Sequence, residues 1–296
     1  MPIRMTPAQL FRSQIRSMQR SGRDAFAAQE VAASGRKLNR PSDSPVGAQR
    51  SVIQRELQGD VKTARAKMNI ARSELATAEG TLADMTNLVS RLRELAVQMA
   101  SEITNASDRT NAAVEVTELK EVLIAQGNTR FGEKRLFAGQ LTGADPFDAL
   151  GNYLGDATAV NVQLPQGAST QVTIRGDDVL RGASGGPDII LEIDNLITAL
   201  TTNNTAGISN AADLMGQGVD LLVSQRTQLG GRVTQLDNLD DYFSTLEFST
   251  AQEISNVKDA DPVAAFTNVT RTQQAFEAAM QVSSASRTRS IFELLF

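Results

Sequence analysis

The stretch LQGDVKTARAKMNIARSELATAEGTLADMTNLVSRLRELAVQMASEI, residues 57–103, decides the fold. Its apolar residues recur at alternating spacings of four and three, which is the pattern of a coiled-coil seam. Because a straight helix drifts by about 20° per heptad against this repeat, so long a stripe predicts a partner helix wound around it. The seam comprises Leu57, Val61, Ala64, Met68, Ala71, Leu75, Ala78, Leu82, Met85, Val89, Leu92, Ala96, Met99 and Ile103.

A second apolar stripe lies near the other end of the chain and is the natural partner of this seam. The first long helix is expected from about Pro45 to Asn105, a length of roughly 90 Å at about 1.5 Å per residue. Both stripes repeat at spacings of three and four, so we expect an antiparallel pair of long helices within one subunit. The partner stripe comprises Leu229, Val233, Leu236, Leu239, Phe243, Leu246, Thr250, Ile254 and Val257.

The two ends of the chain carry weaker helical stripes. The first helix is expected to end near Gly35, and Asp43 or Ser44 can cap the long helix that follows. The last helix is expected to begin at Asp261 and Pro262. An apolar chain end needs cover, so we expect these helices to form the assembly interface. Its candidate residues are Phe11, Ile15, Met18, Phe276, Met280, Ile291, Phe292, Leu294, Leu295 and Phe296.

The middle of the chain reads differently because glycine and proline become frequent. A helix after residue 105 should close at Gly127 and Asn128. Two alternating segments, residues 160–164 and 172–174, flank a Pro-Gln-Gly cluster and predict a β-hairpin. A short helix capped by Asp188 should follow, and then a polar linker over residues 201–210.

The predicted fold is therefore mainly α with a small inserted β-rich domain, in an elongated antiparallel bundle of long helices. We expect three domains. Residues 1–40 with 265–296 form the terminal helices, which we expect to be disordered in the free monomer because isolated helices of weak propensity are marginal in water. Residues 41–140 with 209–264 form the long-helix bundle, and residues 141–208 form the β-rich outer domain.

The composition argues against most enzyme classes. The chain contains no His, Cys or Trp, so the commonest general base, the thiol nucleophile and the usual ligands of structural zinc are missing. Adjacent carboxylates such as Asp177 and Asp178 are better explained by turns, and the glycine-rich residues 182–186 lack the Lys-Ser/Thr of a phosphate-binding loop. We therefore expect no catalytic, cofactor or metal site.

The charge and hydropathy argue against nucleic acid and membrane partners. The net charge is −5, and no face combines clustered Lys and Arg with aromatic residues. No apolar segment approaches the roughly 20 residues of a membrane span, and the arginine-rich start lacks the apolar region of a Sec-type signal. We expect neither a membrane helix nor a cleaved signal.

Three motifs then resemble the bacterial flagellin superfamily. They are RKLNRPSDSP at residues 36–45, RELAVQ at residues 93–98 and RTQLGGRVTQLD at residues 226–237. The resemblance covers roughly residues 1–140 and 210–296. It implies the same order of parts that the periodicity predicts, with both chain ends in an inner coiled coil and the middle outside.

Within that superfamily, LFAG at residues 136–139 with DPF at 145–147, and QQAFEAAMQV at 273–282, are more similar to the hook-filament junction group than to filament flagellin. This resemblance implies a structural adaptor ring made of copies of the chain, between the junction protein FlgK and flagellin. It also implies export by the flagellar type III apparatus with the chaperone FlgN, and an extracellular place in the flagellum. The alternatives are a filament-forming flagellin and, from another class, a secreted enzyme or scaffold with helical arms.

Overall fold

The computed structural model describes the backbone of residues 7–156, 158, 161–163, 169–171 and 174–295, and the side chains of residues 9, 11–156, 158 and 174–285. It is 76% helical, as the apolar periodicity predicts. The chain divides into two compact units, residues 61–244 and residues 1–60 with 245–296. Helices α2 (Pro45–Met99) and α6 (Thr205–Lys258) each contribute to both units.

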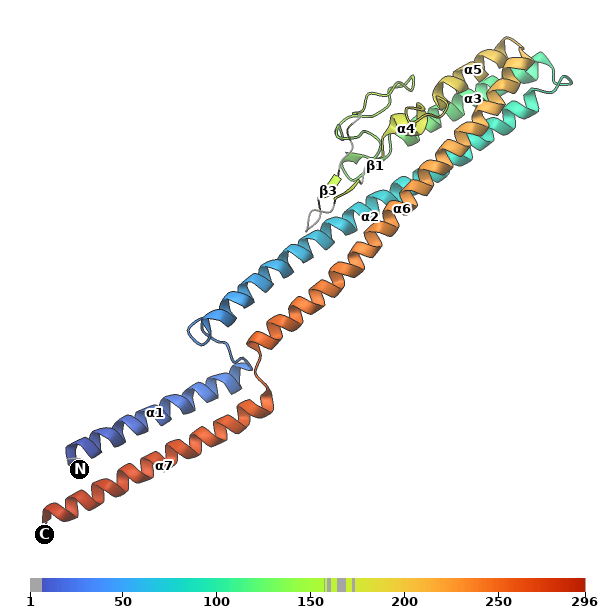
Figure 1. The fold of residues 1–296 in the computed structure, drawn as a ribbon. Helices are drawn as coiled ribbons and strands as arrows, with labels where there is room; N and C mark the ends of the chain where they lie inside the picture. The colour runs from blue at the N-terminus through green and yellow to red at the C-terminus, as the bar shows by residue number, and fades with distance from the viewer. Residues whose placement is uncertain (1–6, 157, 159–160, 164–168, 172–173, 296) are drawn as a thin grey trace. The chain divides into compact units, whose positions relative to one another are not determined.

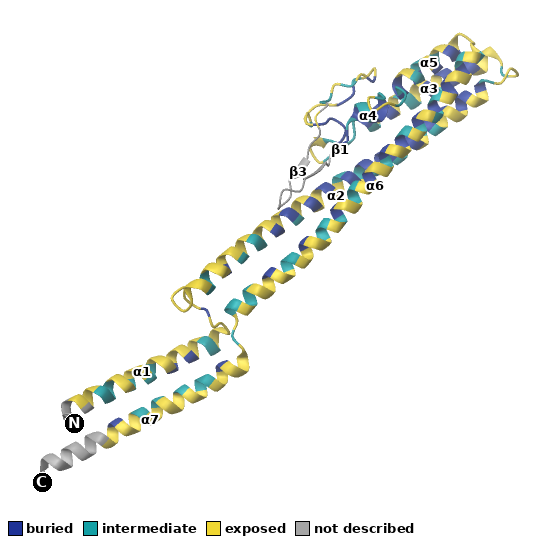
Figure 2. Ribbon diagram, in the orientation of Figure 1, coloured by how far each residue is buried: buried dark blue, intermediate teal, exposed yellow. Residues whose placement is uncertain are grey.

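In the unit of residues 61–244, α2 and α6 run side by side as an antiparallel pair (Figure 1). Helices α3 (Ala106–Gly127) and α5 (Ile189–Thr201) pack against each other. Figure 2 shows that buried residues concentrate along these four helices. The predicted pairing of the two long stripes is therefore present in the fold.

The long helix α2 ends earlier than predicted, and the prediction that Ile103 belongs to the buried seam is wrong. The helix stops at Met99 instead of near Asn105. Ile103 lies in the turn that follows and is 96% exposed. The apolar repeat continues through residue 103, but Asn105 caps the next helix with its side chain, which accepts a hydrogen bond from Asp108 N, so the chain must turn before it.

The described residues of the middle segment form two short antiparallel strand pairs and two helices. Strands β1 (Arg130–Phe131) and β2 (Lys134–Arg135) form the first hairpin, which the sequence pattern did not predict. Strands β3 (Asn161–Gln163) and β4 (Ser169–Gln171) form the predicted second one, with Asn161 opposite Gln171. Of the residues used for that prediction, Val160, Leu164 and Val172 lie outside the described residues. The short helix α4 (Gly176–Leu180) was not predicted.

Helix boundaries follow capping chemistry. Gly35 ends the first helix with φ +66°, and Asp188 Oδ1 accepts a hydrogen bond from Leu191 N at 3.0 Å. The predicted linker over residues 201–210 is wrong, because α6 already begins at Thr205. There Asn204 Oδ1 accepts a hydrogen bond from Gly207 N at 3.0 Å and caps α6, so the connection between α5 and α6 is limited to residues 202–204.

In the unit of residues 1–60 and 245–296, α1 (Pro7–Ser34) and α7 (Pro262–Leu295) pack along each other (Figure 1). Small residues make this possible, since a Cβ on Gly22 would lie 3.1 Å from the Phe276 ring. Asp261 caps α7 as predicted, and Ser44 rather than Asp43 caps α2 by accepting a hydrogen bond from Gly47 N. The predicted helices of both chain ends are present.

Candidate assembly surfaces

The structure buries most of the α2 seam. Leu57 is half-buried and Ile103 is exposed, as described above. Each buried Leu, Met or Val contributes roughly 1.5 kcal/mol or more before chain entropy is subtracted, so this face stabilises the subunit itself. The buried large residues are Val61, Met68, Leu75, Leu82, Met85, Val89, Leu92 and Met99.

The facing stripe on α6 is less deeply buried toward its end. Leu229, Leu236 and Phe243 are buried. Val233, Leu246 and Ile254 are only half-buried. Burial is thus more complete where α3 and α5 add further cover than near the start of α2 and the end of α6 (Figure 2).

Ion pairs between α2 and α6 accompany the apolar seam. Arg65 donates to both carboxylate oxygens of Asp240, at 2.8 and 3.2 Å, and these hydrogen bonds lower the pKa of Asp240. Exposed pairs each contribute at most about 1 kcal/mol, so their value lies in fixing the register of two helices whose apolar faces could slide. Such pairs among the described residues include Arg65 with Asp240, Arg72 with Asp237, and Glu79 with Arg226.

A buried arginine joins the turns at one end of this unit. Arg109 is 3% exposed and donates through Nε to Met99 O at 2.9 Å and through Nη2 to Ser101 O at 2.8 Å. Its Nη1 donates to the side-chain oxygen of Asn203. Asn203 has φ +56° in the turn between α5 and α6, so one guanidinium connects the α2–α3 and α5–α6 turns. Sequence reasoning missed this residue, because a lone arginine on a helix gives no periodic signal.

The segment after α3 is held by side chains that replace backbone pairing. The Asn128 amide accepts from Phe147 N and donates to Phe147 O, both at 2.9 Å, as a paired β-residue would. Arg135 donates to the Asn128 carbonyl and forms an ion pair with Asp145. These contacts give the loop a defined shape without a long strand.

An aromatic cluster anchors the same segment. The rings of Phe147 and Tyr153 lie 5.4 Å apart, and Cβ atoms on Gly127 or Gly176 would come within 3 Å of Phe147. The Tyr153 hydroxyl lies 3.1 Å from the Phe137 carbonyl oxygen. Burial and the charge of a nearby carboxylate raise the pKa of Tyr153 to about 12, so this hydroxyl remains a hydrogen-bond donor near neutral pH.

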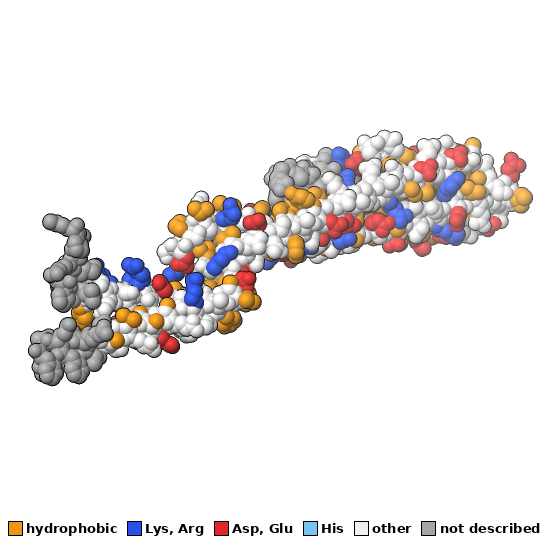
Figure 3. Space-filling view, turned by 60° about the horizontal axis from the view of Figure 1, so that its bottom comes forward, with side chains coloured by type: hydrophobic (Ala, Val, Ile, Leu, Met, Phe, Trp, Pro, Cys, Tyr) orange, Lys and Arg blue, Asp and Glu red, His pale blue; other side chains and the backbone are white. Residues whose placement is uncertain are grey.

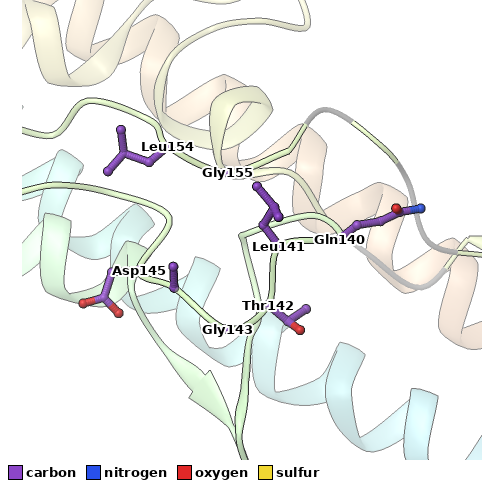
Figure 4. A pocket seen from close by; sticks show the side chains of 8 residues that line it. Gln140, Leu141, Thr142, Gly143, Asp145, Leu154 and Gly155 are labelled. Atoms are coloured by element: carbon purple, nitrogen blue, oxygen red, sulfur yellow. The ribbon is translucent and has the colours of Figure 1, made fainter.

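A shallow pocket in this region is lined by three polar side chains, Gln140, Thr142 and Asp145, beside apolar and glycine residues. It has a volume of about 380 Å³ and lies between the loops of residues 140–145 and 154–155 (Figure 4). Its carboxylate, Asp145, already pairs with Arg135. No group of three or more Asp or Glu that could hold a metal ion occurs in the part of the chain that the structure describes.

The predicted assembly residues at the chain ends show mixed exposure. Phe11 and Met280 are exposed, whereas Ile15, Met18 and Phe276 are half-buried between α1 and α7. The side chains of the last candidates lie outside the described residues, although the backbone from 291 to 295 belongs to α7. These candidates are Ile291, Phe292, Leu294, Leu295 and Phe296.

Other apolar side chains on this unit are more exposed than the predicted ones. Phe26 and Val263 are each 76% exposed, and Phe266 is 63% exposed. Figure 3 shows hydrophobic side chains, in orange, on its surface. Sequence reasoning placed Phe266 on the stripe of the last helix and did not single out Phe26 or Val263. Exposed large apolar residues of this kind are expected where another protein surface covers them.

Comparison with known proteins identifies relatives along the whole chain. The family model of the bacterial flagellin N-terminal helical region matches residues 6–142. Flagellar hook-associated protein 3 of Escherichia coli strain K12 is 22% identical over 99% of both chains.

Solved structures of such proteins share the fold. The flagellar junction protein FlgL from Legionella pneumophila covers 71% of this chain and 100% of its own, with a TM-score of 0.58 and 16% identity. Bacillus cereus FlgL covers 69% of this chain and 99% of its own, with a TM-score of 0.59 and 17% identity.

Among the described residues, none of the helices combines the length and the apolar character that a membrane-spanning helix needs.

Proposed function

We propose that the chain is a member of the flagellin superfamily and a structural adaptor at the hook-filament junction of the bacterial flagellum. The observation that carries the proposal is the match to hook-associated protein 3 over 99% of both chains. A match of this extent includes the middle segment as well as the two helical arms. The structural role in the flagellum and the adaptor role at the junction both rest on this match.

The structure supports a mechanical role because the helices that bury most of the large apolar residues differ from the helices that expose them for contact with other subunits. The α2–α6 pair buries most of the large residues of the α2 seam, and ion pairs fix its register within one subunit. The α1–α7 pair packs through small residues and leaves Phe26, Val263 and Phe266 exposed. We assign the first pair to a rigid strut and the second to contacts with neighbouring subunits.

The division into three domains that was predicted from the sequence fits this role. Residues 1–40 with 265–296 form the assembling helices, residues 41–140 with 209–264 the strut, and residues 141–208 an outer decoration. In a ring, copies of the chain pack sideways through heterologous contacts, which let the same patch meet a different neighbour at each end.

The partners in this proposal are the junction protein FlgK on the hook side, flagellin on the filament side, and the chaperone FlgN during type III export. An adaptor of this kind carries no active site. The one carboxylate in the recess around Asp145 is already paired with Arg135, which favours a structural role over a secreted enzyme.

Electron microscopy of cells that lack this protein tests the adaptor role. We expect complete hooks without filaments, together with flagellin monomers released into the medium. Restoring the wild-type chain should restore filaments. Normal filaments on the deletion strain would refute the proposal.

The second candidate is a filament-forming flagellin, which the match to the flagellin N-terminal region favours. Adding purified chain to filament seeds separates the two functions. A flagellin elongates the seeds into long filaments of this chain alone, whereas an adaptor adds no more than a short terminal layer.

A further inference from the structure

Four arginines form a stripe on helix α1, and none of them has a carboxylate partner among the described residues. Arg12, Arg16, Arg20 and Arg23 follow one another at spacings of four, four and three, so they share one face of the helix, and all four are exposed. At about 100° per residue, this arginine stripe points away from the face that packs against α7.

The stripe has no charge partner among the described residues. The side-chain hydrogen bonds recorded for it run from Arg16 Nε to Arg12 O and from Arg23 Nε to Gln19 O, both at 3.3 Å. No ion pair in the described part of the chain joins these arginines to a carboxylate, and Glu30 pairs with Arg40 instead. Like charges one turn apart destabilise a helix, so a stripe of this kind favours an acidic partner.

The arginine stripe runs into an open groove with an exposed aromatic residue. The groove has a volume of about 670 Å³ and lies between α1 and Arg40 of the following turn. Phe26 lines it and is 76% exposed. A partner that fits must therefore present acidic and apolar side chains together. The lining residues are Arg23, Phe26, Ala27, Gln29, Glu30, Ala33 and Arg40.

The chain itself carries a complementary surface. Residues 61–244 contain 23 Asp and Glu against 15 Lys and Arg, a net charge of −8, whereas the rest of the chain has a net charge of +3. On α3, Glu118 and Glu121 are exposed and share a face with Val114 and Val122, which are 58% and 46% exposed. No ion pair is recorded for either glutamate.

From this complementarity we propose that the arginine stripe of α1 docks on the acidic and apolar face of α3 in a second copy of the chain. The contact is an ion-paired interface with Phe26 packed beside it, and it gives the assembly a defined sideways neighbour. The inference rests on the proposed function, because it requires copies that stand side by side in an axial structure.

Carbodiimide coupling in isolated flagella tests this contact, since the reagent joins a lysine amine directly to a carboxylate that touches it. The full-length variant Arg16→Lys, Arg20→Lys keeps the charge and makes the stripe reactive. The matched control is Arg50→Lys, Arg55→Lys, which changes two exposed arginines of α2 in the same unit. We expect the stripe variant to give several-fold more covalent dimer, at twice the chain mass of 31.8 kDa, than the control.

Mass spectrometry of the dimer should join a peptide with residue 16 or 20 to a peptide with Glu118 or Glu121. Adding Glu118→Gln and Glu121→Gln should abolish the excess dimer. Equal dimer yields in the two variants, or coupling of the stripe only to a different protein, would overturn the inference. Absence of the wild-type chain from the flagella would instead overturn the proposed function. The single variant Arg20→Lys serves if the double variant fails to assemble.

Discussion

At the scale of single residues, this fold depends on polar side chains that take the place of regular backbone pairing. Arg109 binds carbonyl oxygens of the turn after α2 and the side chain of Asn203, and the Asn128 amide pairs with both polar groups of Phe147. A buried polar group left without its partner costs about 1–3 kcal/mol. These residues therefore fix the conformation of turns that the apolar seam does not contact.

Replacing Arg109 by Ala should lower the free energy of unfolding by about 2–4 kcal/mol, because the carbonyls of Met99 and Ser101 lose a buried donor. Arg109→Lys keeps the charge but lacks the planar group that reaches three acceptors, so it should recover only part of the loss. Urea denaturation followed by circular dichroism measures both. The exposed Arg50→Ala is the control, and an Arg109→Ala loss as small as that of the control would contradict the bridging role.

Tyr153 provides a pH-dependent prediction. Its pKa is raised from 10.0 to about 12 in the fold, so the folded chain holds this proton more tightly than the unfolded chain. The resulting stability is fully present below about pH 10 and is lost as the pH rises toward 12. Absorbance of tyrosinate should show a late transition that Tyr153→Phe removes. The chain has only two tyrosines, so an unchanged titration curve in the variant would count against the assignment.

At the scale of elements, apolar periodicity predicted the helices and failed where polar contacts decide the path. The stripe over residues 57–103 predicted a long helix, which the structure ends at Met99, and the caps at Asp188 and Asp261 predicted the starts of their helices, because burial and capping act locally. The hairpin of β1 and β2 and the start of α6 were missed. Arg135 beside the first hairpin and Asn204 at the start of α6 form polar contacts that leave no apolar repeat in the sequence.

Glycines within α6 differ in a way that the sequence cannot show. Cβ atoms on Gly230 and Gly231 would meet nothing within 4 Å, whereas one on Gly218 would lie 3.1 Å from Ile189. Alanine is favoured over glycine in an exposed helix by about 1 kcal/mol. The Thr234 hydroxyl also donates to Gly230 O, a contact that often bends helices. Gly230 and Gly231 therefore mark a weak point of α6.

Gly230→Ala and Gly231→Ala should each raise the free energy of unfolding by about 0.5–1 kcal/mol, and hydrogen exchange of the α6 amides around them should slow. Gly218→Ala is the matched control and should destabilise the chain, since its methyl group must displace Ile189. Chemical denaturation of the three variants decides the matter. Destabilisation by Gly230→Ala would mean that this backbone is packed after all.

At the scale of the whole molecule, we propose that stability and assembly depend on different parts of the chain. The large buried side chains concentrate in residues 61–244, while the terminal helices pack through Gly22, Ala25, Ala28 and Ala265. Terminal helices with so little apolar burial gain little from folding in an isolated subunit, because helix formation alone is marginal in water. We therefore expect protease to remove residues 1–40 and 265–296 of the monomer before it cuts the remainder, and equal resistance would contradict this expectation.

Deleting residues 291–296 separates the two roles most directly. These residues include Ile291, Phe292, Leu294, Leu295 and Phe296, which we assign to contacts with neighbouring subunits. The deletion should leave the thermal unfolding midpoint within about 1 °C of the wild type, because it removes nothing from the α2–α6 seam. It should nevertheless abolish incorporation into flagella, measured by immunoblot of sheared filaments and by motility in soft agar. A deletion variant that loses fold and incorporation together would show that the apolar end belongs to the core of the subunit.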